Sequence, residues 1–253
     1  MKNIKVLNMN IYIANDYDEM SKKGAEVIAG IVKEKETPIL GLATGGTPIG
    51  MYKELIRMNK EGDVDFSKTN TFNLDEYYPI NKESPQSYYY FMKENLFNHI
   101  NIDEENTNIP DGMASDIDKE SKEYDEKLRK IGGVDIQVLG IGSNGHIGFN
   151  EPSDVFEPET HKVALDKQTI EDNARFFSSI NEVPTEAITM GIGSIMTAKK
   201  ILLLASGKNK ATVIKEMILG KVTPRIPASI LQFHPDVIVI LDKDAASELL
   251  PNL

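Results

Sequence analysis

Residues 38–44 read PILGLAT, an apolar run of strand length that leads directly into two glycines. Residues 48–60 follow with apolar side chains at the spacing of a helix. Four more segments have the composition of strands, at residues 70–74, 134–140, 200–206 and 237–241. Buried strands that alternate with helices are typical of a parallel sheet covered on both faces. The sequence therefore predicts a three-layer α/β/α fold of Rossmann-like type with a mostly parallel sheet.

Further helices are predicted at residues 87–100, 117–131 and 209–219, where apolar side chains recur at helical spacing. Residues 187–190 are a weaker strand candidate, and the region 150–190 has room for extra strands. At roughly 150 residues per domain, 253 residues make one large domain or two small ones. Since no stretch has the composition of a linker, we expect a single domain over residues 1–253.

The charge balance limits the partners. Lys and Arg number 28 and Asp and Glu number 39, which gives a net charge of −11. Such a chain repels nucleic acid and anionic membranes, so we expect neither as a partner. Any anionic ligand must therefore meet a local positive site. No signal peptide is visible and the apolar runs are too short to span a bilayer, so we expect a cytoplasmic protein.

The chain has no cysteine, which excludes disulfides, a thiolate nucleophile and a cysteine zinc site. Its four histidines are too scattered to suggest a metal site made of histidine alone. We therefore expect no metal at the functional site.

Ligands of parallel α/β sheets bind at the carboxyl ends of the strands, which directs attention to the residues just after each strand. Gly45, Gly46, Thr47 and Pro48 follow the strand at 38–44. Glycines let a ligand approach the backbone, Thr47 can cap the next helix, and Pro48 suits its first position. A helix N-terminus favours phosphate, so these residues are a candidate phosphate site; the alternative is a plain tight turn.

Asp75 and Glu76 follow the strand at 70–74. Neighbours in an extended segment point to opposite sides, so only one carboxylate is expected to face the site. The alternative is an aspartate that caps the next turn.

Residues 140–152 read GIGSNGHIGFNEP and contain the spacing of a dinucleotide-binding loop. We reject that match because further breakers, instead of a helix, follow the third glycine. What remains is His146 with Glu151 five residues later, a pair of residue types common in acid–base catalysis. The alternative is a polar turn.

Arg175 and Lys210 are candidate phosphate ligands. Lys210 lies in the first turn of a predicted helix, where a cation is unfavourable unless an anion sits beside it. An arginine such as Arg175 can bind a phosphate through two parallel hydrogen bonds. The alternative for both is a solvated surface cation.

Together these segments resemble the glucosamine-6-phosphate deaminase family over nearly the whole chain. The resemblance is carried by LGLATGGTPIGMY (40–52), TFNLDEYY (71–78), SYYYFMKENLF (87–97), LGIGSNGHIGFNEP (139–152), NARFF (173–177), SGKNKA (206–211) and PASILQFHPDVIVILD (227–242). It implies isomerisation coupled to deamination, from glucosamine 6-phosphate and water to fructose 6-phosphate and ammonia, with no metal and no organic cofactor.

The resemblance also implies roles. His146 would open the sugar ring, Glu151 would orient His146 and stabilise its charged form, and Asp75 would move the proton from C2 to C1. Gly45, Gly46, Thr47, Arg175 and Lys210 would hold the phosphate.

Two departures from the family pattern concern Asn144 and residues 153–163. Many members carry Asp where this chain has Asn144, although a shorter bacterial branch also reads NGH; we expect Glu151 to take more of that role. Longer members are hexamers activated by N-acetylglucosamine 6-phosphate through basic residues, whereas residues 153–163 here are acidic. We expect no such activation and a monomer or small homo-oligomer.

Three other functions remain open: a galactosamine-6-phosphate deaminase, a 6-phosphogluconolactonase-like hydrolase, and a sugar-phosphate sensor without catalysis. The first would need the same residues. The FNEP segment disfavours the second, and the full set of acid–base residues disfavours the third. Residues 77–86, which are polar and contain proline, are the candidate lid.

Overall fold

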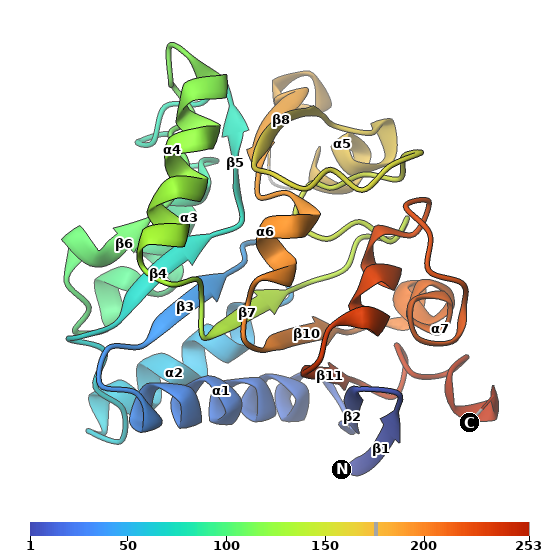
Figure 1. The fold of residues 1–253 in the computed structure, drawn as a ribbon. Helices are drawn as coiled ribbons and strands as arrows, with labels where there is room; N and C mark the ends of the chain where they lie inside the picture. Colours follow the sequence, from blue (N-terminus) through green and yellow to red (C-terminus); the bar gives the residue numbers. More distant parts are fainter. Residues whose placement is uncertain (175–176, 253) are drawn as a thin grey trace.

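The computed structural model describes residues 1–174 and 177–252 and shows a large sheet with helices on both faces (Figure 1). All neighbouring strands of this sheet are parallel except for the β1–β2 pair at one edge. Within the described residues the strands follow in the spatial order β1 (Lys2–Val6), β2 (Met9–Ile13), β11 (Val237–Leu241), β10 (Ile201–Ala205), β7 (Ile136–Leu139), β3 (Ile39–Leu42), β4 (Asn70–Asn73) and β6 (Thr107–Asn108). The predicted mostly parallel α/β fold is confirmed.

Two helical layers enclose the sheet. In Figure 1, α1 (Tyr17–Glu34) and α2 (Ile49–Lys60) lie below it, while α4 (Ile117–Lys130) and α6 (Ile192–Met196) lie above it. The first pair packs closely because Gly24 of α1 lies against Met51 and Gly50 of α2 lies against Ser21. The other α-helices are α3 (Tyr88–Asn95), α5 (Lys167–Asn173) and α7 (Ala211–Leu219).

A second, antiparallel sheet stands at the carboxyl end of the large one. Its strands are β5 (Asp75–Tyr78), β9 (Glu186–Thr189) and β8 (His161–Ala164). The chain passes from one sheet to the other at Leu74, whose N–H donates to Leu42 O (3.1 Å) while its carbonyl accepts from Met190 N (2.7 Å). The extra strands expected between residues 150 and 190 are therefore present, and β5 begins at the residue predicted to act as a base.

The predicted strands and helices are found with small shifts at their ends. The helix expected over 87–100 ends at Asn95 and is followed by a 3₁₀ turn over Phe97–His99. The elements β1, β2, α1, β6, α5 and α6 were not predicted. No helix among the described residues is long and apolar enough to cross a membrane. The extent of a single domain over 1–253 stays a prediction.

A buried carboxylate fastens the second sheet to the helices above the first. Asp125 of α4 is 3% exposed and accepts the N–H of Thr160 (2.8 Å), the hydroxyl of Thr160 (2.7 Å) and the hydroxyl of Ser194 (2.8 Å). Thr160 leads into β8 and Ser194 belongs to α6. One side chain therefore joins three elements around the site.

Asp125→Ala should lower the free energy of unfolding by about 2 to 4 kcal/mol, because buried donors lose their acceptor. Urea denaturation followed by circular dichroism measures this. The control is Asp118→Ala, an exposed residue of the same helix, which should change the free energy of unfolding by about 0.5 kcal/mol or less. A loss for Asp125→Ala no greater than that of the control would contradict the fastening role.

Candidate active site

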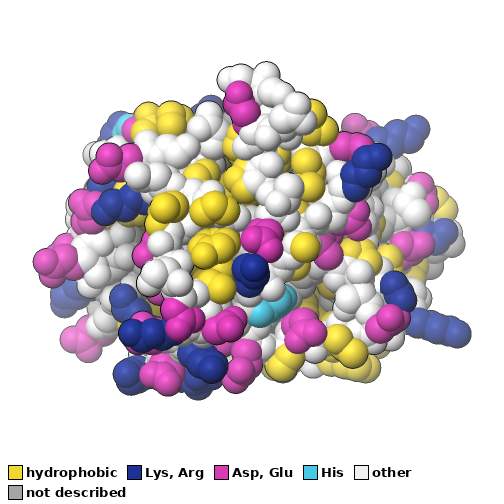
Figure 2. All heavy atoms as spheres, turned by 90° about the horizontal axis from the view of Figure 1, so that it is seen from above, with side chains coloured by type: hydrophobic (Ala, Val, Ile, Leu, Met, Phe, Trp, Pro, Cys, Tyr) yellow, Lys and Arg dark blue, Asp and Glu magenta, His cyan; other side chains and the backbone are white. Residues whose placement is uncertain are grey.

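A cleft of about 950 Å³ opens at the carboxyl ends of β3, β4, β7 and β10. Most of the lining follows one of these strands, and one wall comes from α5. Figure 2, which views the molecule from above Figure 1, shows apolar side chains gathered near the middle of that side, with acidic and basic side chains mixed around them. The lining includes residues 43–47, 74–75, 140–144 and 168–169, with His146, Gly148, Asn173, Ser206, Asn209 and Lys210.

The turn after β3 is held by a side chain that the sequence analysis did not single out. The Tyr17 hydroxyl accepts the N–H of Gly50 (2.8 Å) and lies 3.1 Å from both Gly46 O and Thr47 O, to which it can donate. Gly45 has φ +90°, which requires glycine in practice. Tyr17 at the start of α1 therefore fixes the candidate phosphate turn at the start of α2.

The expected cap by Thr47 was wrong. Helix α2 begins at Ile49 with Pro48 at the cap position, and the cap residue itself accepts no hydrogen bond through its side chain. The physical reason is that the Tyr17 hydroxyl takes the Gly50 N–H that a side-chain cap would otherwise accept. Thr47 lines the cleft instead.

Of the two predicted cations, the structure brings Lys210 to the cleft. Lys210 ends a 3₁₀ turn, Lys208–Lys210, just before α7. The turn is held by the Asp242 carboxylate, which accepts the Ser206 hydroxyl (2.5 Å) and the Gly207 N–H (3.0 Å). Arg175 lies outside the described residues.

The two carboxylates at the start of β5 point to different surroundings, as predicted from strand alternation. Asp75 lines the cleft and is 6% exposed. Glu76 accepts the N–H groups of Tyr77, Tyr88 and Tyr89, each at 2.9 Å, and so caps the start of α3. The cap considered for the aspartate is therefore made by its neighbour.

Burial raises the pKa of both carboxyl groups. It raises the pKa of Asp75 to about 8, with the nearby charge of Glu76 as a second cause. Burial also raises the pKa of Glu76, to about 7, against the lowering effect of its three backbone hydrogen bonds. Asp75 is thus a carboxyl group whose proton is lost near neutral pH, which suits a residue that takes up and returns protons.

The glycines of the loop after β7 make room for neighbouring side chains. A Cβ on Gly142 would lie 2.3 to 2.5 Å from the ring of His146. A Cβ on Gly148, whose φ is +58°, would lie 2.9 Å from the Thr189 hydroxyl and 3.6 Å from Asp75 Oδ2. No helix opens between residues 140 and 152, which confirms that the dinucleotide-loop spacing was correctly rejected.

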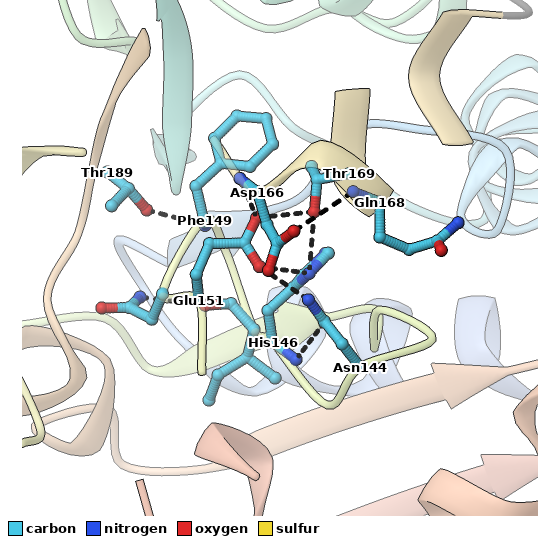
Figure 3. A network of polar contacts seen from close by, with 10 residues as sticks. Asn144, His146, Phe149, Glu151, Asp166, Gln168, Thr169 and Thr189 are labelled. Atoms are coloured by element: carbon cyan, nitrogen blue, oxygen red, sulfur yellow. Dashed lines mark hydrogen bonds and ion pairs between the residues drawn. The ribbon is translucent and has the colours of Figure 1, made fainter. Parts of the chain in front are cut away.

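His146 and Glu151 form the predicted pair. His146 Nδ1 lies 3.3 Å from Glu151 Oε2, and the amide of Asn144 donates to the same oxygen at 2.8 Å. Asn144 Oδ1 also accepts the backbone N–H of His146 at 3.2 Å, so Asn144 contacts both Glu151 and the main chain of His146 (Figure 3). Burial raises the pKa of Glu151, but hydrogen bonds from His146, Thr169 and Asn144 outweigh it and bring this pKa to about 2.

Two further contacts to Glu151 come from the start of α5. The Thr169 hydroxyl donates to Glu151 Oε1 at 2.5 Å, and the Asp166 N–H approaches the same oxygen at 3.4 Å (Figure 3). The sequence did not identify Thr169 as a functional residue. The only hint was its position between two segments that resemble the family, residues 139–152 and 173–177. The expected lid, residues 77–86, contributes no described lining residue, whereas α5 does.

No group of three or more potential metal-ligating side chains occurs among the described residues. The arrangement instead offers a histidine backed by an ionised carboxylate, a separate buried carboxyl group, and a glycine turn with a lysine nearby.

Comparisons with known proteins identify the family of the chain. A sequence model of the family described as glucosamine-6-phosphate isomerases/6-phosphogluconolactonase matches residues 15–239. The chain belongs to this family. It is 61% identical over 241 residues to a glucosamine-6-phosphate deaminase of Clostridium botulinum (strain Loch Maree), covering 95% of this chain and 99% of that one. It is 57% identical over 244 residues to the deaminase of Thermoanaerobacter pseudethanolicus, covering 96% of each.

Solved structures of the family share the fold. One described as a monomeric glucosamine-6-phosphate deaminase has a TM-score of 0.92 at 44% identity and covers 94% of this chain and 99% of its own. A 6-phosphogluconolactonase from Thermotoga maritima has a TM-score of 0.71 at 20% identity, covering 93% of this chain and 99% of its own. The second likeness shows the fold alone.

The raised pKa of Asp75 predicts that the free energy of unfolding falls as pH rises from about 4 to about 8. Between the ordinary aspartate pKa and about 8, the folded protein keeps a proton that the unfolded chain has lost, so stability falls as pH rises. Asp75→Asn removes this dependence. From about pH 5 to about pH 8 the wild type should therefore lose roughly 3 to 4 kcal/mol relative to Asp75→Asn.

Urea denaturation at both pH values measures the difference. Asp18→Asn, an exposed change in α1, is the control and should follow the wild type across this range. Parallel curves for wild type and Asp75→Asn would show that burial does not raise the pKa of Asp75.

Proposed function

We propose that this chain converts glucosamine 6-phosphate and water into fructose 6-phosphate and ammonia. The observation that carries the proposal is that one cleft holds both a histidine backed by an ionised carboxylate and a separate carboxyl group of raised pKa. The names of the relatives described above support it.

His146 opens the pyranose ring in this proposal. Its Nδ1 faces Glu151, which leaves Nε2 for the sugar. Nε2 takes the proton of the C1 hydroxyl and gives one to the ring oxygen, so that the C1–O5 bond breaks and the aldehyde forms. The ionised Glu151 stabilises the charged imidazole between these two transfers.

Asp75 carries the isomerisation. Its carboxylate removes the proton from C2, while the aldehyde oxygen takes up a proton and the ammonium group gives one up, so that an enolamine forms. Asp75 then returns its proton to C1, which leaves a C1 hydroxyl and an imine at C2. Water adds to the imine carbon and ammonia leaves, which gives the ketone. The ammonium group of the substrate favours the charged form of Asp75, which offsets the effect of burial on its pKa.

The phosphate is assigned to Gly45, Gly46 and Thr47 with Lys210 and Arg175. Backbone N–H groups at the start of α2 and the lysine supply the local positive site that an acidic chain needs. Holding a group remote from C1 and C2 orients the reacting carbons and so contributes to the rate. We further expect a cytoplasmic monomer or small homo-oligomer that acts in amino-sugar catabolism and binds no nucleic acid.

The proposed enzyme is not activated by N-acetylglucosamine 6-phosphate. A cavity of about 160 Å³ lies behind Glu151 and is lined in part by residues 150–153, 155–157 and His161. Its described lining contains Glu151 and Glu157 and no lysine or arginine. A phosphate would meet carboxylates there, which disfavours binding.

An ammonia-release assay with glucosamine 6-phosphate and galactosamine 6-phosphate tests the function. Ammonia should appear with the glucosamine compound, and Asp75→Asn should abolish it while binding remains. The rate should depend hyperbolically on substrate and be unchanged by N-acetylglucosamine 6-phosphate. Ammonia released only from galactosamine 6-phosphate would show that this epimer is the substrate. Ammonia released from neither compound would contradict the proposed function.

We expect Glu151 and Asn144, which both contact His146, to contribute differently to kcat. Glu151→Gln should reduce kcat about a hundredfold or more, because the charged imidazole loses its anionic partner. Asn144→Asp should cost much less, because a carboxylate there can also support the imidazolium. Measuring kcat for both variants checks this order, and equal losses would contradict it.

A further inference from the structure

Four hydrogen-bond donors meet the carboxylate of Glu151. Two of them, the His146 ring and the Asn144 amide, belong to the loop after β7, and both contact Oε2. The other two, the Thr169 hydroxyl and the Asp166 N–H, come from the start of α5 and address Oε1. The two oxygens of one carboxylate are therefore held by two different segments (Figure 3).

We propose that Thr169 is a positioning residue for ring opening, through which α5 fixes the orientation of Glu151 against His146. This inference rests on the proposed function, in which Glu151 stabilises charged His146. Thr169 itself touches no reacting atom in this scheme.

The contact is short and protected. Thr169 is 3% exposed, and its Oγ1 lies 2.5 Å from Glu151 Oε1 and 3.5 Å from His146 Nδ1. A hydroxyl bears one proton, and the shorter distance assigns it to the carboxylate. Without this donor, Oε1 would keep only the 3.4 Å approach of the Asp166 N–H, and the carboxylate would be held mainly through Oε2.

Because residue 144 is an asparagine in this chain, the hydrogen bond from Thr169 to Glu151 has a larger effect on the charged form of His146. An aspartate at that position would give His146 a second anion, whereas the amide supplies a donor to Glu151 and no charge. The charged imidazole therefore depends on Glu151 alone among these neighbours. The orientation of that one carboxylate then determines how well the cation is stabilised.

The position of helix α5 affects the orientation of Glu151 through Thr169. It forms a wall of the cleft through Gln168 and Asn173, on either side of Thr169. Its apolar support is a small cluster separate from the main core, in which Ile170 packs with Tyr77, Phe149 and Leu165. The hydrogen bond from Thr169 to Glu151 adds to this small apolar support.

The test is a double-mutant cycle. Thr169→Val keeps the shape and removes the donor, and kcat for ammonia release should fall about tenfold to a hundredfold with KM within about twofold. Thr169→Ser restores a hydroxyl and should recover kcat to within about threefold. In a Glu151→Gln background, Thr169→Val should cost less than about twofold, because its effect passes through Glu151.

The matched control is Thr212→Val, which removes another threonine-to-glutamate hydrogen bond (to Glu248, 2.9 Å) at an exposed position outside the cleft and should leave kcat unchanged. Circular dichroism confirms folding, and Thr169→Ala replaces the valine variant if that one unfolds. Equal losses from removing Thr169 in both backgrounds would overturn the positioning role. Failure of the wild type to release ammonia would instead overturn the proposed function, and this inference with it.

Discussion

The backbone of Leu74 joins the two sheets, and the geometry of the cleft depends on that junction. One hydrogen bond ties its N–H to β3 and another ties its carbonyl to the segment after β9. The next residue is Asp75, which is therefore fixed by both sheets at once. The chain leaves the same small sheet at the end of β8 and enters α5. Asp75 and the wall of the cleft formed by α5 are therefore both supported by the sheet of β5, β9 and β8.

Two carboxyl groups of this cleft are driven apart in pKa by their surroundings. Burial and the nearby charge of Glu76 favour the neutral form of Asp75, whereas hydrogen bonds from His146, Thr169 and Asn144 favour the ionised form of Glu151. A difference of this kind separates a group that exchanges protons from a group that holds a constant charge. It follows that the roles assigned to the two acids arise from the elements that surround them, since the residue types alone are equivalent.

The sequence predicted what depends on local pattern and missed what depends on distant contacts. The apolar run of β11 was predicted at its observed bounds, and strand alternation correctly separated Asp75 from Glu76. The short, half-exposed strand β1 has too little apolar character to be recognised. Tyr17 and Thr169 were missed because each acts on a segment far from it in sequence, and the Thr47 cap was wrong for the same reason.

The net charge of −11 says little about the charge of a ligand in this cleft. Salt screens exposed charges beyond about 8 Å at physiological ionic strength, and on the face in Figure 2 acidic and basic side chains are mixed. Within that distance the balance is local: His146 opposes Glu151, and burial favours the neutral form of Asp75. In the proposed function, a phosphate at the turn after β3 lies near Lys210 and the N-terminus of α2, so nearby groups of this kind bear on its binding more than the net charge of the chain does.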